Sequence, residues 1–445
     1  MQDFKDIDKQ NRSKRSIRAK RLEGRNAFKT IQEDDEKPRK TRYGIVLGVI
    51  AALLASYPII SVLNSSPAKT AMPTAAAETV SLKNLDQGSA FRLAAEAYPK
   101  AQPQGGSLVA PLPQGGQVVY AINEDVQKRV EKVLSDYKVP YGLFVAMEPR
   151  TGRILAMVSH SSVEPAWEKD GSYHLYPLAS LFKIVTATAA LESKKVTPET
   201  PFAFNGRLTS ESPKYWRVHP GRGNQQMPLA VAMGKSVNPV YGRLAGEVVG
   251  RDPLLLYAGR YGFNQALLPG APIMSSTAPA PSTDNELMRM GAGLNREVKA
   301  SPFHAAAMMA AVANGGVMMA PGFAKEIRDA KGNLVFTHKP QALRTVMTPE
   351  TAASMARMLS TTVQTGTSRR AFHDRRGRRM LASVSIAAKT GSIDGTDPAG
   401  HYSWFAAYAP MEDPQIALAA LVVNGNKWRI KATSVGEQAL EAFFR

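Results

Sequence analysis

The stretch Ser180-Leu-Phe-Lys-Ile-Val-Thr-Ala-Thr-Ala-Ala-Leu-Glu192 is the segment from which the rest of the chain is best interpreted. It is rich in Ala, lacks Gly and Pro, and begins with a residue that favours helix starts, so it predicts a helix. Between Ser180 and Leu191 the only charge is Lys183. A helix that is apolar nearly all round is a buried helix. A lysine in its first turn is therefore expected to have a specific purpose.

The spacing of Ser180 and Lys183 suggests what that purpose is. Residues three apart lie on one face of a helix, within side-chain reach, and Ser180 lies at the positive end of the helix dipole. This is the arrangement of a nucleophilic serine beside a lysine that takes its proton. The same spacing is common in ordinary helices, and Ser66-Pro-Ala-Lys69 repeats it in a linker-like stretch. Whether this spacing marks a catalytic pair or an ordinary helix start therefore depends on the other motifs in the chain.

Two further short motifs follow along the chain. Lys235-Ser-Val-Asn238 contains a Ser-x-Asn triplet and precedes a helical pattern. Lys389-Thr-Gly391-Ser392 comes at the end of an expected strand, 383–389, one face of which carries only small side chains before the lysine. Such a strand, with a glycine that removes bulk, allows an extended peptide to lie against it as an added strand. Each motif alone also fits a simpler role, as a helix cap or as a strand end with a solvated lysine.

Ser-x-x-Lys, Ser-x-Asn and Lys-Thr-Gly, in this order, are the motif set of penicillin-interacting serine enzymes. From about Gln117 to the C-terminus the chain resembles the transpeptidase domain of penicillin-binding proteins. Further stretches carry the resemblance: 145–157, 236–245, 300–304 with 313–316, and 388–392 with 404–408. With one expected anchor and no recognisable glycosyltransferase segment, the chain is most similar to the monofunctional, bitopic (class B-like) group. It departs from that group in a missing or reduced pedestal, 64–116, and in Ser392, where threonine is common.

The resemblance implies an α/β (α+β) fold with a mostly antiparallel sheet flanked by helices and preceded by one transmembrane helix. The residue patterns agree, because helices between an early hairpin and three late strands are typical of such a mixed domain. Helical spacing of apolar residues predicts helices at 81–98, 123–137, 239–249, 253–261, 301–314, 349–363 and 434–444. Short apolar or alternating runs predict strands at 143–148, 154–158, 383–389, 402–409 and 416–423.

The resemblance also implies the chemistry of the three motifs. Ser180 would attack the carbonyl of a terminal D-Ala-D-Ala and form an acyl-enzyme, with Lys183 as the base and Ser236 passing the proton to the leaving amine. An ordinary lysine is a poor base at neutral pH, so the pKa of Lys183 has to fall. Burial and the charge of Lys389 would both lower it. The acyl group would then pass to an amine of a neighbouring stem peptide, which makes a crosslink.

The same resemblance assigns the substrate-binding groups. Asn238 would hold the substrate backbone, and the backbone N–H groups of Ser180 and Ser392 would form the oxyanion hole. The carboxylate of the substrate would be held at the third motif, by Lys389, Thr390, Gly391 and Ser392. No cofactor and no metal are implied. The chain has no cysteine, which excludes a thiol nucleophile and thiolate metal sites.

The beginning of the chain predicts a membrane anchor. Residues 1–42 hold 14 Lys and Arg against 8 Asp and Glu and predict a basic cytoplasmic tail. Residues 43–63 carry no charge and are long enough to span a bilayer. The basic flank 37–42 would keep the N-terminus in the cytoplasm of an inner-membrane, single-pass protein whose catalytic domain, 117–445, is periplasmic or otherwise extracytoplasmic. Residues 64–116 have the Pro, Ala and Gly composition of a linker. A buried soluble helix or a signal peptide are the alternatives for 43–63.

Several alternatives to a peptidoglycan crosslinking enzyme stay open. A D,D-carboxypeptidase, which transfers the acyl group to water, shares all three motifs. A β-lactamase also shares them, but no Glu-x-x-x-Asn stands in a suitable position between Ser236 and Lys389. A non-catalytic β-lactam sensor is the non-enzyme alternative. The expected partners are stem peptides, β-lactams and a membrane glycan polymerase, and not nucleic acid. The arginine-rich segment 369–379 would be a solvated loop or a contact for anionic lipid or polymer.

Overall fold

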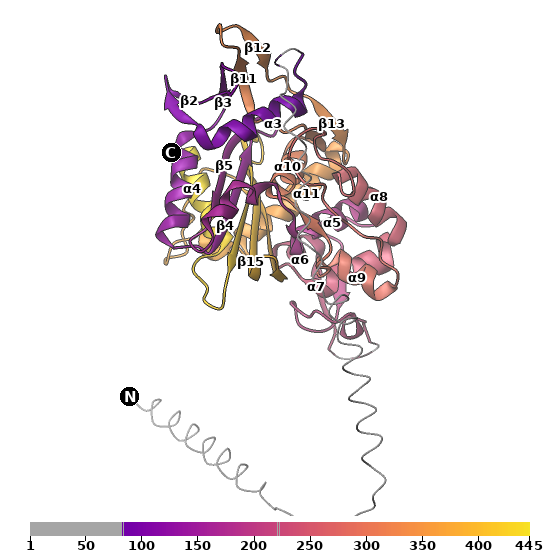
Figure 1. Cartoon of the computed structure of the whole chain (residues 1–445). Coiled ribbons are helices and arrows are strands. Elements are labelled where there is room, and N and C mark those ends of the chain that lie inside the picture. The colour runs from indigo at the N-terminus through magenta and orange to yellow at the C-terminus, as the bar shows by residue number, and fades with distance from the viewer. Residues whose placement is uncertain (1–81, 83, 220, 222) are drawn as a thin grey trace, which may run out of the picture. The chain divides into compact units, whose positions relative to one another are not determined.

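The computed structural model describes residue 82, residues 84–219, residue 221 and residues 223–445 (Figure 1). The chain divides into one unit at Met1–Glu78 and a compact unit at Thr79–Arg445. The expected basic tail, 1–42, and the expected anchor, 43–63, lie outside the described residues. Among the residues that the structure does describe, no helix combines the length and the apolar character needed to cross a membrane.

A five-stranded antiparallel sheet forms the centre of the larger unit, in the order β14-β15-β16-β4-β5 (Figure 1). The strands are β4 (Tyr141–Met147), β5 (Ile154–His160), β14 (Ala387–Thr396), β15 (Ala399–Ala409) and β16 (Ile416–Asn424). The outer strands are β14, which carries the third motif, and β5, which belongs to the early hairpin. The two edges of the sheet are therefore formed by segments that lie far apart in sequence.

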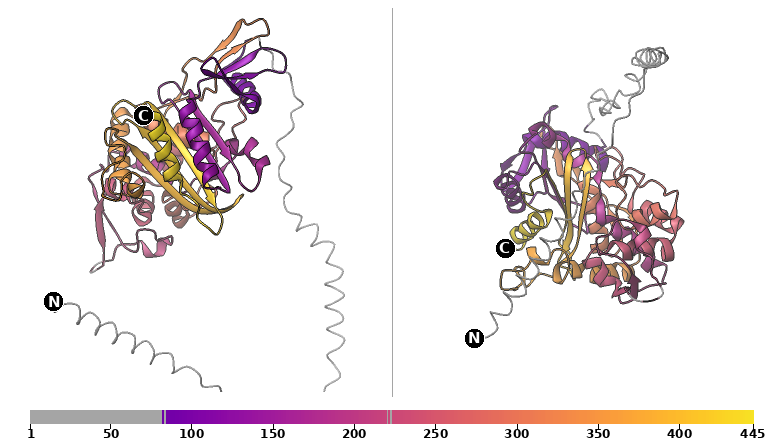
Figure 2. Two further views of the ribbon diagram at one scale, coloured as in Figure 1. Left: turned by 90° about the vertical axis from the view of Figure 1, so that its left-hand side faces the viewer. Right: turned by 90° about the horizontal axis from the view of Figure 1, so that it is seen from below.

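Helices cover both faces of this sheet, and the alternation of side chains assigns each residue to one side. On β4, Phe144 and Ala146 pack with α4 (Glu124–Asp136) and α12 (Ala432–Phe444) in one core. Figure 2 shows these two helices side by side on one face of the sheet. Leu143 and Val145 point the other way, into the larger core that contains α10 (Pro302–Ala313). The predicted α/β fold with helices flanking an antiparallel sheet is confirmed.

The helices beside the β14 edge hold the first two motifs. They are α5 (Lys183–Glu192), α6 (Leu229–Gly234), α7 (Asn238–Arg243), a π-helix (Leu244–Val249), α8 (Arg251–Tyr261), α9 (Asp284–Gly291) and α11 (Pro349–Gln364). Every residue of α5 except its last is buried, as its apolar composition predicts. The helix predicted to start at Ser180 starts instead at Lys183, after a 3₁₀ turn at Ala179–Phe182.

A second, smaller sheet joins the segment before the expected catalytic domain to a later hairpin. Its order is β1-β2-β3-β11-β12. The elements are α3 (Gln87–Ala97), β1 (Gln102–Gln104), β2 (Ser107–Pro111), β3 (Gln117–Tyr120), β11 (Ala324–Arg328) and β12 (Leu334–Thr337). The segment 64–116, expected to be a linker or a reduced pedestal, is folded from α3 onward, where a helix was predicted, and its strands join β3 and β11 in one sheet across Gln117. The glycines that suggested a linker form hairpin turns, at Gly105-Gly106 and Gly115-Gly116, where φ is positive.

The third-motif strand also differs from its prediction. The expected strand 383–389 ends at the motif lysine, whereas β14 begins at Ala387 and continues past the motif to Thr396. It continues because β15 pairs with it along its whole length, as far as Thr396 with Ala399. The motif therefore lies within an edge strand, and its backbone is held straight on one side by β15. The remaining predicted helices and strands are present, with bounds that differ by a few residues.

Candidate active site

Ser180 and Lys183 lie in the turn that leads into α5, and both are buried. Ala179, just before the serine, has a φ of 54°, a left-handed conformation that a residue with a side chain seldom adopts. The Nζ atom of Lys183 lies 2.8 Å from Oγ of Ser180, 2.8 Å from Oδ1 of Asn238 and 2.5 Å from the carbonyl oxygen of Ala292. The first and second motifs therefore meet at this one amine.

The surroundings of Lys183 favour the neutral amine. Burial lowers the pKa of Lys183 well below its usual value, and the nearby charge of Lys389 lowers it further. A neutral amine has two hydrogens and one lone pair. Its hydrogens can be donated to Asn238 and to the carbonyl of Ala292, which leaves the lone pair for the hydroxyl hydrogen of Ser180. This is the hydrogen-bond pattern that a general base requires.

Ser236 and Lys389 connect the second motif with the third. Ser236 has a φ of 56°, so both serines of the site lie at or beside strained backbone. The Nζ atom of Lys389 donates to Oγ of Ser236 at 2.8 Å and to the carbonyl oxygen of Thr390 at 2.8 Å. Burial lowers the pKa of Lys389 to about 7. This amine is thus near its midpoint at neutral pH, and a bound carboxylate would restore its charge.

Gly391 brings the third motif against the nucleophile. A side chain at this glycine would lie 3.0 Å from Cδ1 of Leu181 and 3.1 Å from Cβ of Ala179. The missing side chain therefore makes room for the turn that carries Ser180, a role that the strand pattern does not predict. Ser392 follows it and is exposed. The two N–H groups expected to form the oxyanion hole, of Ser180 and Ser392, come from these adjoining segments.

Two contributors to the site lie outside the three sequence motifs. The carbonyl of Ala292 is the third partner of Lys183, and Gly293 beside it has a φ of 69°. A side chain on Gly293 would lie 2.3 Å from the carbonyl oxygen of Ala179, so only glycine allows this loop to approach the nucleophile turn. The run Gly291-Ala-Gly293 is a signal of close backbone approach. The other contributor is Thr367, whose hydroxyl contacts Thr390.

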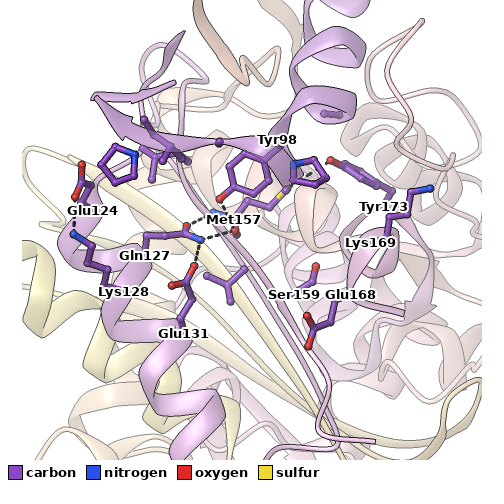
Figure 3. A pocket seen from close by; sticks show the side chains of 17 residues that line it. Tyr98, Glu124, Gln127, Lys128, Glu131, Met157, Ser159, Glu168, Lys169 and Tyr173 are labelled. Carbon is purple, nitrogen blue, oxygen red and sulfur yellow. Dashed lines mark hydrogen bonds and ion pairs between the residues drawn. The ribbon is translucent and has the colours of Figure 1, made fainter. Parts of the chain in front are cut away.

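A cavity of about 700 Å³ lies at the opposite edge of the sheet, beside β5 (Figure 3). Tyr98, Gln127, Met157 and Tyr173 line it, and none of the motif residues does. A second hollow, of about 540 Å³, is lined by residues between Asn205 and His219. The candidate catalytic groups are thus defined by their contacts with one another rather than by either of these two cavities.

Comparisons with known proteins agree with the arrangement of motifs. Residues 142–443 match the family model described as the penicillin binding protein transpeptidase domain. The peptidoglycan D,D-transpeptidase PbpA of Mycolicibacterium smegmatis is 29% identical over 356 residues, which cover 72% of this chain and 70% of that protein.

Solved structures give the same result for the fold. The D,D-transpeptidase domain of a peptidoglycan glycosyltransferase from Eggerthella lenta has a TM-score of 0.63 at 26% identity, over 80% of this chain and 91% of that chain. An imipenem acyl-enzyme complex of penicillin-binding protein A from Mycobacterium tuberculosis has a TM-score of 0.63 at 24% identity, over 75% of this chain and 80% of that chain.

Proposed function

The chain belongs to the family of penicillin-binding protein transpeptidase domains, and we propose that it is a monofunctional peptidoglycan D,D-transpeptidase. It crosslinks stem peptides through an acyl-enzyme, and β-lactams acylate the same serine. The observation that carries this proposal is the position of the Lys183 amine, which lies 2.8 Å from Oγ of Ser180 and 2.8 Å from Oδ1 of Asn238. A buried amine whose pKa is lowered, next to a serine hydroxyl, is an activated nucleophile.

The first half of the reaction is acylation. Lys183 takes the hydroxyl proton while Oγ of Ser180 bonds to the carbonyl carbon of the penultimate D-Ala. The negative charge that develops on the carbonyl oxygen is stabilised by the N–H groups of Ser180 and Ser392. The bond to the terminal D-Ala nitrogen then breaks, and this nitrogen receives a proton through Ser236. Lys389 is hydrogen-bonded to Ser236 and so keeps its hydroxyl in place.

The third motif holds the substrate. The terminal carboxylate binds to the amine of Lys389 and the hydroxyls of Thr390 and Ser392, while the amide of Asn238 holds the peptide backbone. The substrate lies along the outer side of β14, where no strand pairs with it in the described sheet. In the second half-reaction the nitrogen of an amine on another stem peptide bonds to the ester carbon, and the bond from this carbon to Oγ of Ser180 breaks. The proton that the amine loses passes through Lys183 to Oγ of Ser180.

We also propose that residues 43–63 anchor the protein in the cytoplasmic membrane, with the catalytic domain outside the cytoplasm. The uncharged length of this segment and its basic flank support the proposal. A membrane glycan polymerase is the expected partner, because crosslinking requires newly made glycan strands. Membrane extraction and protease accessibility of the full chain test the anchor and its orientation.

Covalent labelling tests the catalytic proposal. The full chain is incubated with a fluorescent penicillin and compared with Ser180→Ala and with a matched control, Ser66→Ala, which alters another Ser-x-x-Lys spacing. We expect a stable adduct on the wild type and on Ser66→Ala, and none on Ser180→Ala. An adduct on folded Ser180→Ala would refute the assignment of the nucleophile, and rapid loss of the adduct would indicate a β-lactamase.

Product analysis distinguishes the two remaining activities. A pentapeptide donor is supplied with an amine-bearing acceptor peptide, and the products are separated by mass. Crosslinked dimer is the expected main product. A trimmed tetrapeptide without dimer would instead establish a D,D-carboxypeptidase.

A further inference from the structure

The hydroxyl of Thr367 connects the segments that carry the second and third motifs. Its Oγ1 lies 2.6 Å from Oγ1 of Thr390 and 3.3 Å from the carbonyl oxygen of Gly234. Gly234 is the last residue of α6, two positions before Ser236. The backbone N–H of Thr367 also donates to this carbonyl, at 3.0 Å. Thr367 itself belongs to none of the three motifs.

The local sequence holds Thr367 in this position. It follows α11 by three residues, and Gly366 before it packs directly on α6: a side chain there would lie 2.2 Å from the carbonyl oxygen of Gly234. A side chain on Gly234 would in turn lie 2.3 Å from Oγ1 of Thr361, on α11. Two glycines thus let α6 and α11 approach closely, and this approach places the Thr367 hydroxyl beside β14.

The number of hydrogens decides how this contact can work. Each threonine hydroxyl has one hydrogen to donate. A carboxylate has none, so Thr390 must donate its hydrogen to bind the substrate's carboxylate. The 2.6 Å contact between the two hydroxyls then persists only if Thr367 is the donor. If Thr367 donated to Gly234 instead, Thr390 would donate to Thr367, and its hydrogen would point away from the substrate.

We propose that Thr367 is a positioning residue, which donates to Thr390 and thereby directs the Thr390 hydrogen toward the carboxylate of the substrate or β-lactam. The inference rests on the proposed function, because it assumes that Thr390 binds a carboxylate. The alternative bond of Thr367 is the weaker one, at 3.3 Å, and the Gly234 carbonyl keeps its 3.0 Å bond from the Thr367 N–H. Donation to Thr390 is therefore favoured, and it strengthens the next hydrogen bond in the chain.

The test compares acylation of the full chain by benzylpenicillin and by its methyl ester. Thr367→Val removes the hydroxyl and keeps the shape and the backbone N–H. The second-order acylation rate with the acid should fall about tenfold, through weaker binding rather than a slower covalent step, while the rate with the ester changes little. Thr367→Ser, which keeps a hydroxyl, should restore the rate with the acid. Thr365→Val is the matched control, since its exposed hydroxyl has no contact with Thr390.

A double-mutant cycle shows whether Thr367 acts through Thr390. Thr390→Val should lower acylation by the acid, and adding Thr367→Val to it should lower the rate no further. Equal losses with acid and ester, or additive losses in the cycle, would overturn the inference, and melting temperatures of all variants detect misfolding. Failure of the proposed function would look different, because the wild type itself would then not be acylated.

Discussion

The polar groups at the two edges of the central sheet differ in their type and in their hydrogen-bond partners. At the β5 edge, the side-chain amide of Gln127 pairs with both the N–H and the C=O of Met157, and the hydroxyl of Tyr98 donates to the same C=O (Figure 3). At the β14 edge, two lysine amines are fully buried with hydroxyl, amide and carbonyl partners. The backbone groups at the β5 edge are satisfied by hydrogen bonds, whereas the β14 edge carries buried amines that could transfer protons.

The pKa shifts at the two edges point in opposite directions. Burial raises the pKa of Tyr98 and of Tyr173, so these hydroxyls stay neutral at every physiological pH. Burial lowers the pKa of Lys183 well below its usual value and the pKa of Lys389 to about 7, so both amines lose their protons more readily than ordinary lysines. The same physical cause therefore makes one edge inert and the other reactive.

Left-handed backbone occurs near both edges. Ala179 and Ser236 lie in the segments around the β14 edge, and Lys138, with a φ of 47°, lies just after α4, the helix beside the β5 cavity. The larger hollow lies at the β5 edge, with about 700 Å³. In this protein the buried lysine amines distinguish the candidate site, whereas left-handed backbone and cavity volume do not.

Replacing the proposed base should give the largest difference in acylation rate between a variant at the β14 edge and a variant at the β5 edge. We expect Lys183→Met to lower the rate of acylation by a fluorescent penicillin about 10³–10⁴-fold, because the proton of Ser180 then has no acceptor at 2.8 Å. Lys128→Met, at the rim of the β5 cavity, removes an exposed lysine paired with Glu124 and should leave the rate unchanged. Comparable losses in both variants would remove the functional distinction between the edges.

Alanine substitution of a left-handed glycine near each edge, in two separate variants, should give the next largest difference in acylation rate and stability. Gly293→Ala places its Cβ 2.3 Å from the carbonyl oxygen of Ala179, so the nucleophile turn must move. We expect about a hundredfold slower acylation and a loss of roughly 2–4 kcal/mol in unfolding free energy. Gly106→Ala, in the hairpin near the β5 cavity, has the same kind of φ but no atom within 4 Å of the new Cβ.

For Gly106→Ala, only the backbone strain of about 1 kcal/mol is expected, with normal acylation. Urea unfolding and labelling rates of both alanine variants measure the two effects. If Gly293→Ala behaved like Gly106→Ala, the close approach to Ala179 would have no part in shaping the site.

Features that depend on neighbouring residues could be predicted from the sequence, whereas contacts between distant segments could not. The buried helix α5 and the strands of the central sheet follow from local periodicity, and Ser180 with Lys183 follows from spacing. The contact of Lys183 with the carbonyl of Ala292 could not be predicted, since it joins segments more than a hundred residues apart through a backbone atom. The strands β1 and β2, at 102–111, were not predicted, because glycine pairs indicate turns and linkers equally well.

Thr367 illustrates the same limit. Its position follows from the close packing of α6 on α11, which only Gly234 and Gly366 permit. No pattern within a single helix or strand records such an approach. Contacts between motifs, in contrast to the motifs themselves, therefore required the tertiary structure.

The pH dependence of acylation provides a smaller test, specific to the β14 edge. The productive state needs Lys183 neutral and Lys389 charged, so the acylation efficiency should rise with pH and then fall as Lys389 loses its proton. Because the pKa of Lys389 is about 7, the fall should begin near neutral pH and approach tenfold per pH unit. In Lys389→Arg the charge persists, and the alkaline fall should disappear. An alkaline limb that remains in this variant would assign the titration to another group.

Stability should respond in opposite directions when a polar side chain is replaced at each edge. Lys389 has a pKa of about 7 in the folded state and the ordinary 10.5 when unfolded, so the folded state binds its proton less well. The resulting penalty is complete below pH 7 and is lost as pH rises toward 10.5. Allowing for its two lost hydrogen bonds, we expect Lys389→Met to stabilise the fold by about 1–4 kcal/mol at pH 6, while it impairs acylation.

Gln127→Leu should do the reverse, because it leaves the N–H and C=O of Met157 without their amide partner. We expect a loss of about 1–3 kcal/mol in unfolding free energy and unchanged acylation. Thermal unfolding of both variants at pH 6 and pH 9 measures these changes, and the gain in Lys389→Met should shrink at the higher pH. A Lys389→Met variant that is less stable than the wild type at pH 6 would mean that the buried amine supports the fold. The contrast would then be between two stabilising networks rather than between a structural edge and a catalytic one.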